Sequence, residues 1–245
     1  MEAGKIRVLG IDFFNGTAQG SVDAIKGGGL LVVPAAPALI TIDSDRMYFE
    51  ALLKSDVAIP DSGYMVMIWN LLKRPSLKRI SGWKFLTTFL ADQEVIKTDS
   101  ILMVDPNAEE AAANAQYLRS LGYTMDGRHS YIAPWYKGKV EDKALLSMVE
   151  NQQPRYIIIN LGGGVQEKLG LFLKNNLSYA PSIICTGAAI AFLTGRQANM
   201  PGWADKLFLG WLVRCIDNPK VFVPRYLKAF RLITLILQHG QKAPI

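Results

Sequence analysis

The 245-residue sequence is poor in the side chains from which metal centres and disulfide frameworks are built. It contains two cysteines, Cys185 and Cys215, and two histidines, His129 and His239. The cysteines lie in apolar surroundings without metal-ligand spacing, which favours a reduced, cytosolic compartment. Neither histidine has a partner that would predict a metal site or a serine-type catalytic triad.

Long apolar runs are also missing. No stretch approaches the roughly 18 apolar residues needed to span a bilayer, and residues 1–10 lack the apolar core of a signal peptide. Half of the residues are hydrophobic and a fifth are charged, which is typical of a globular protein rather than a disordered one. We therefore expect a soluble body on which any membrane contact is peripheral.

Charge is present but unevenly distributed. The net charge of the chain is +6, and residues 196–245 carry all of it, because eight basic residues there oppose only Asp205 and Asp217. The first 195 residues sum to zero. This asymmetry indicates that the C-terminal part meets something anionic.

Short β-rich segments alternate with helical ones along the first 195 residues. The pattern predicts strands at residues 6–11, 30–34, 57–59, 101–104, 155–161 and 182–185, and helices at 18–26, 42–54, 63–72, 83–90, 108–121, 168–175 and 188–193. The alternation favours an α/β fold, with a Rossmann-like, mostly parallel sheet covered by helices on both faces. Strand signals stop near residues 195–201. We expect a catalytic domain over 1–195 and a basic, amphipathic, membrane-docking appendage over 196–245.

Ligands bind beyond the carboxyl ends of the strands in an open parallel sheet. Asp61 follows a short strand there, as either the N-cap of the next helix or a catalytic base. The glycines at 162–164 precede a helix and can cradle phosphate, although close packing explains them equally well. Gln166 beside them can orient a sugar or a pyrophosphate. The turn at Gly187 favours plain packing, and Arg79 is either a phosphate clamp or, more commonly, a solvated cation.

Several motifs occur in a fixed order along the chain. They are residues 58–63 (AIPDSG), 79–82 (RISG), 161–167 (LGGGVQE), 187–195 (GAAIAFLTG), 201–203 (PGW) and 209–214 (LGWLVR), followed by Pro219 and Arg225-Tyr226. Over about residues 5–231, this ordered set resembles the WecG/TagA/CpsF family of bacterial glycosyltransferases, glycosyltransferase family 26.

The resemblance implies an inverting transferase that moves an N-acetylmannosamine-like sugar from a UDP donor. The implied acceptor is a sugar on polyprenyl pyrophosphate at the inner face of the cytoplasmic membrane, in cell-surface polysaccharide synthesis. By the motifs, Asp61 is the general base, and Gln166 and Arg79 complete the catalytic set. The implied substrate-binding residues are Gly162, Gly163, Gly164, Glu167, Gly187, Arg214 and Arg225. No metal and no other cofactor is expected.

Two departures from the family pattern bear on activity. Ala35 stands where the family usually has asparagine, and Ala191 stands where members tend to have aspartate. These changes keep open an alternative, in which the chain is a catalytically inactive homologue that binds a nucleotide sugar or acts as a scaffold in a polysaccharide assembly complex.

The basic C-terminal segment allows a second alternative. Phosphodiester backbones attract basic patches, and Trp203, Trp211 and Tyr226 could stack on bases. The apolar run at residues 232–237 instead favours a membrane interface, or a helix packed on the core or on a neighbouring subunit. We therefore expect no nucleic-acid partner, and a homo-oligomer stays open.

Overall fold

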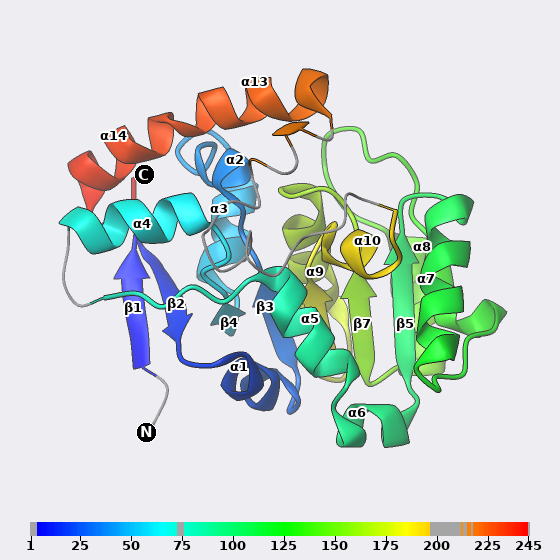
Figure 1. Ribbon diagram of the computed structural model, residues 1–245. Coiled ribbons are helices and arrows are strands. Elements are labelled where there is room, and N and C mark those ends of the chain that lie inside the picture. Colours follow the sequence, from blue (N-terminus) through cyan, green and yellow to red (C-terminus); the bar gives the residue numbers. More distant parts are fainter. Residues whose placement is uncertain (1–3, 73–75, 197–211, 213–214, 217, 245) are drawn as a thin grey trace.

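A computed structural model describes residues 4–72, 76–196, 212, 215–216 and 218–244 (Figure 1). Its strands form one eight-stranded sheet in the order β1-β2-β4-β3-β8-β7-β5-β6. Only β1 and β2 pair antiparallel within this sheet, so the predicted α/β class with a mostly parallel sheet is confirmed. The strands are β1 (Gly4–Val8), β2 (Ile11–Asn15), β3 (Gly29–Val32), β4 (Val57–Ala58), β5 (Ile101–Asp105), β6 (Ser130–Ile132), β7 (Tyr156–Ile159) and β8 (Ser182–Cys185).

Helices cover both faces of the sheet. One face carries α2 (Ala36–Leu39), α3 (Arg46–Leu53), α4 (Gly63–Leu72), α8 (Lys143–Gln152), α9 (Val165–Asn176) and α14 (Arg231–His239). The other carries α1 (Ala18–Ile25), α5 (Gly82–Leu90), α6 (Gln93–Thr98), α7 (Ala108–Ser120) and α10 (Ala189–Leu193). A short 3-10 turn, η1 (Gly127–His129), precedes β6, and α13 (Pro219–Ala229) packs against α2 (Figure 1).

The central strands are apolar on both sides because both faces are covered. In β7, Ile157 and Ile159 face one core, whereas Tyr156 and Ile158 face the other. All four side chains are fully buried. Continuous apolar runs of this kind are typical of parallel strands, which explains why β7 and β8 were evident in the sequence.

The first strand differs from the expectation of one strand over residues 6–11. The chain turns at Leu9 and Gly10, whose φ angles are +53° and +82°, and Val8 pairs with Ile11 across an antiparallel hairpin. Positive φ at both central residues is the geometry of a tight two-residue turn. A leucine is rarely found there, so no turn was predicted at this position. The segments β6 and α8 were also not predicted.

The C-terminal helices are fastened to the body of the protein. In α14, Leu232, Leu235 and Ile236 are buried against the core, and the helix packs on α4. The N–H groups of Leu9 and Gly10 donate to the carbonyls of residues 240 and 241, at 2.8 and 3.0 Å. The apolar run at 232–237 therefore packs mainly on the core, which is one of the alternatives that the sequence left open. Within the described ranges, no helix has the length and apolar character to cross a bilayer.

Gly170 lies where α9 packs tightly against β3 and β8. A Cβ atom there would lie 2.7 Å from Leu30 Cδ1 and 2.9 Å from Cys185 Sγ. We expect Gly170→Ala to lower the free energy of unfolding by about 1–2 kcal/mol, because overpacking outweighs the gain in helix propensity. Urea unfolding measures the change. Gly127→Ala is the control, since a Cβ there meets nothing within 4 Å; equal stability of the two variants would contradict the prediction.

Candidate active site

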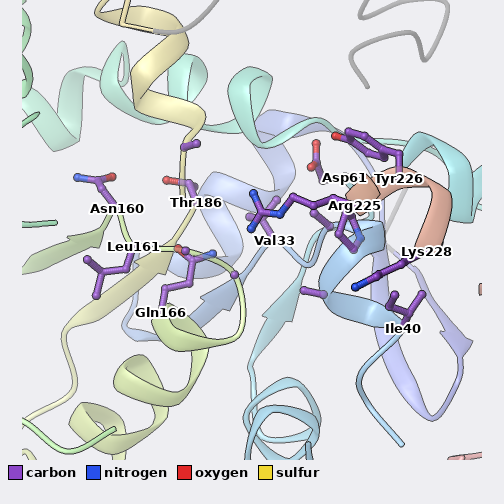
Figure 2. A pocket seen from close by; sticks show the side chains of 17 residues that line it. Val33, Ile40, Asp61, Asn160, Leu161, Gln166, Thr186, Arg225, Tyr226 and Lys228 are labelled. Carbon is purple, nitrogen blue, oxygen red and sulfur yellow. The ribbon is translucent and has the colours of Figure 1, made fainter. Parts of the chain in front are cut away.

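A cavity of about 360 Å³ opens beyond the carboxyl ends of β3, β4, β7 and β8. Within the sheet, β4 lies next to β3 on one side, and β8 and then β7 lie on the other side of β3. The strand order therefore changes direction at β3. Such a switch point is the usual place for a ligand in an open α/β sheet. Helix α13 bounds the cavity with Arg225, Tyr226 and Lys228, and Figure 2 shows Arg225 reaching across it.

Asp61 reaches this cavity from the end of β4. Its side chain is 28% exposed, and its Oδ1 accepts a hydrogen bond from the N–H of Gly82, 3.0 Å away, where α5 begins. Arg79 lies beside it: Nε donates to the Asp61 carbonyl at 2.8 Å, and a terminal nitrogen lies 3.8 Å from Oδ1. The N-cap role that the sequence left open belongs instead to Ser62, whose hydroxyl accepts from Met65 N–H. Asp61 Oδ2 accepts no hydrogen bond from the described residues.

The glycine turn and Gln166 form a further part of the cavity wall. Gly162 and Gly163 line the cavity, and Gly164, with φ of +90°, begins α9. Gln166 is 3% exposed and donates from Nε2 to Glu167 Oε1 at 3.1 Å. Because the ionised carboxylate can only accept, this contact fixes the orientation of the amide when Glu167 has lost its proton.

Glu167 is fully buried behind that wall. Its Oε2 accepts the N–H of Gly164 at 2.6 Å, so one carboxylate holds both the glycine turn and Gln166. Burial raises the pKa of Glu167 to about 7. Burial, and then the neighbouring Glu167 carboxylate, raises the pKa of both Tyr48 and Cys185.

The structure gathers most of the predicted site residues at one place. Asp61, Gly162, Gly163, Gln166, Gly187 and Arg225 all line the cavity. Gly164 and Glu167 lie behind its wall, and Arg79 lines a neighbouring cavity of about 460 Å³ with Lys78 and Lys84. Arg214 lies outside the described residues. The roles of these residues stay predictions.

Sequence reasoning missed three lining residues, Asn160, Thr186 and Lys228. Thr186 directly follows the strand predicted at 182–185, so taking the first residue after that strand would have found it. Asn160 was hidden because the strand predicted at 155–161 ran past the end of β7 at Ile159. Lys228 gave no local signal, because its position depends on how α13 packs. In the part of the chain that the structure describes, no group of three or more His, Cys, Asp or Glu side chains could hold a metal ion.

The fold and the cavity define an α/β protein with a ligand crevice at a switch point, a glycine turn before a helix, and a carboxylate at a nearby strand end. The chain matches the model of the glycosyl transferase WecG/TagA/CpsF family over residues 6–244. It belongs to that family and is a glycosyltransferase, as the ordered motifs predicted.

Two characterised relatives are similar to this chain, and both are named N-acetylglucosaminyldiphosphoundecaprenol N-acetyl-beta-D-mannosaminyltransferase. The protein of Bacillus subtilis (strain 168) is 24% identical over 192 residues, which cover 74% of this chain and 71% of the relative. The protein of Bacillus spizizenii (strain ATCC 23059 / NRRL B-14472 / W23) is 24% identical over 217 residues, which cover 86% of this chain and 80% of the relative.

The buried Glu167 predicts how stability depends on pH. In the folded protein this carboxyl keeps its proton up to about pH 7, whereas its ordinary pKa is 4.5. The folded state therefore holds the extra proton between these values, and stability falls as the pH rises through them. Relative to Glu167→Gln, we expect wild type to lose about 3 kcal/mol of unfolding free energy between pH 4.5 and 8.

Urea unfolding at several pH values measures this difference. Glu141→Gln, at an exposed site, is the control and should follow the wild-type curve. A constant difference between wild type and Glu167→Gln across this range would contradict the prediction.

Proposed function

We propose that the protein is an inverting glycosyltransferase that moves an N-acetylmannosamine-like sugar from a UDP-sugar to a sugar linked to polyprenyl pyrophosphate, in the synthesis of a bacterial cell-surface polysaccharide. The observation that carries this proposal is the cavity at the switch point, which Asp61, Gln166 and Arg225 all line. The names of the two relatives support the choice of sugar and acceptor.

Asp61 is suited to act as the general base. In an inverting transfer, the acceptor hydroxyl oxygen attacks the anomeric carbon, the bond from that carbon to the diphosphate oxygen breaks, and UDP leaves with the electron pair. The hydroxyl proton goes to the Asp61 carboxylate, whose Oδ1 is held by Gly82 N–H while the side chain remains partly exposed. A positioned base of this kind typically contributes about 10²–10⁴ in rate.

Cations on α13 match the charge of such substrates. Arg225 and Lys228 line the cavity from a helix that packs over α2. Guanidinium and ammonium groups can bind diphosphate oxygens and offset the charge that develops on a leaving diphosphate. Gln166, held by Glu167, lies on the opposite side of Arg225 from Asp61 in Figure 2. We assign it to orienting the donor's pyrophosphate.

The same helices supply a surface for a lipid-linked acceptor. Leu227, Phe230 and Leu237 are 61%, 59% and 58% exposed along α13 and α14, close in sequence to Arg225 and Lys228. Exposed apolar side chains beside cations favour the interface of an anionic membrane. We propose that this surface docks peripherally on the inner face of the cytoplasmic membrane, where a polyprenyl chain would reach the cavity.

Replacing Asp61 tests the catalytic proposal. With UDP-N-acetylmannosamine as the donor and N-acetylglucosamine diphosphate on a short prenyl chain as the acceptor, Asp61→Asn should lower the transfer rate at least about 10²-fold. Its thermal midpoint should stay unchanged, since an amide oxygen can still accept from Gly82. Asp23→Asn, at an exposed position on α1, is the control.

Full activity of Asp61→Asn would remove Asp61 as the base. Wild type that binds UDP-sugars but transfers none of them would favour the inactive homologue.

Membrane docking predicts a defined loss of lipid binding. We expect the double variant Leu227→Gln, Leu237→Gln to bind phosphatidylglycerol vesicles at least about tenfold more weakly, because it removes two apolar side chains from the interface. Binding of wild type should also weaken as salt rises, through screening of Arg225 and Lys228. Vesicle co-sedimentation measures both effects. Leu53→Gln, at the opposite end of the sheet where α3 leads into β4, is the control; a similar loss there would contradict the docking surface.

A further inference from the structure

A row of polar side chains crosses three neighbouring strands next to the cavity. Asp105 ends β5, and Asn160 and Thr186 directly follow β7 and β8. Val104 pairs with Ile159, and Ile159 pairs with Cys185, so the three polar residues occupy the next level of the sheet. Their exposed fractions are only 0%, 8% and 7%.

Asp105 organises this row from within the protein. Its Oδ1 accepts hydrogen bonds from the side-chain amides of Asn160 and of Asn114 on α7, both at 2.7 Å. Because a carboxylate only accepts, both amides must turn their NH₂ groups toward it, and their oxygens then point elsewhere. Burial raises the pKa of Asp105, and its two amide donors oppose that effect.

Four oxygens in the row have no hydrogen-bond partner among the described residues. They are Asp105 Oδ2, Asn114 Oδ1, Asn160 Oδ1 and Thr186 Oγ1, and all four are buried. Buried polar atoms without partners destabilise a folded protein and are rare. A group of four at one place indicates that a further molecule with N–H or O–H groups completes their hydrogen bonding.

The row lies at the end of the cavity that faces away from the proposed base. Asn160 and Thr186 line the cavity on the side opposite Asp61 (Figure 2). In the sheet, β4 and β7 are separated by β3 and β8, so the strand ends that carry Asp61 and Asn160 are about 14 Å apart. A nucleotide sugar whose sugar lies at Asp61 and whose diphosphate lies near Arg225 would place its nucleoside at this row.

We propose that Asn160 and Thr186 form a specificity-determining subsite that binds an N–H or O–H group of the donor's nucleoside, with Asp105 and Asn114 as positioning residues. The identity of the nucleoside as uridine rests on the proposed function. The subsite selects hydrogen-bond donors because the Asn160 amide oxygen that it presents can only accept.

The first test needs no ligand. If the Thr186 hydroxyl is unpartnered in the empty protein, Thr186→Val should raise the thermal midpoint by about 2–4 °C, because valine has the same shape and buries no polar group. Thr87→Val is the matched control, since Thr87 Oγ1 donates to the Trp83 carbonyl at 2.8 Å; it should not raise the midpoint. A lower midpoint for Thr186→Val would mean that the row is a satisfied structural network, and would overturn the subsite.

The second test measures selectivity by titration calorimetry with three probes. They are UDP, 3-methyluridine diphosphate, which lacks the base N–H, and 2′-deoxyuridine diphosphate, which lacks a ribose hydroxyl. Wild type should bind UDP about tenfold more tightly than at least one of the analogues. In Thr186→Val and in Asp105→Asn, which frees the Asn160 amide to turn, this ratio should fall toward one. A merely structural role would leave the ratio unchanged, and an unchanged ratio overturns the proposal.

The two tests separate this subsite from the proposed function. If wild type binds none of the three probes while Thr186→Val is stabilised, the uridine donor is wrong and the subsite stands for another ligand that carries N–H or O–H groups. If wild type binds UDP no more tightly than both analogues, the proposed uridine donor is supported and the proposed subsite is wrong.

Discussion

The pairing of β8 between β3 and β7 fixes the position of the whole cavity. Val32 pairs with Cys185, and Cys185 pairs with Ile159, so the three strands end at the same level. The loops that follow them must therefore leave the sheet side by side. The glycine turn, the Thr186-Gly187 turn and the start of α2 meet there because of this register. A shift of one residue in β8 would turn Thr186 to the opposite face of the sheet.

The cavity wall is held together by a residue whose ionised form weakens the fold. Glu167 fastens both Gln166 and the glycine turn, yet its burial favours the protonated form. An apolar residue there would remove that cost, and the turn and the amide would lose their common support. Asp105 likewise accepts a hydrogen bond from the side-chain amide of Asn160, and burial also raises the pKa of Asp105. Both carboxylates trade stability for the fixed orientation of an amide beside the cavity, as is common where sites must be pre-organised.

Local signals account for what the sequence could predict. The strand at 182–185 was correct at both ends, because four buried residues, three of them apolar, lie between Pro181 and a Thr-Gly turn. Asp61 was placed at the cavity because strand ends in parallel sheets converge. The hairpin at Leu9 was missed, since its positive φ is maintained by pairing and not by residue preference. The positions of Arg225 and Lys228, and the contact of Asp105 with Asn160, depend on packing between distant segments, which local patterns do not contain.

The first hairpin and the last helix share backbone hydrogen bonds, and this attachment has a mechanical consequence. Helices α13 and α14 follow one another with only Phe230 between them. The carboxyl end of α14 is held at Leu9 and Gly10, and α13 carries Arg225 and Lys228 to the cavity. A substitution in the hairpin turn that broke these two hydrogen bonds would thus act on the helix pair that carries both cations without touching any residue that lines the cavity.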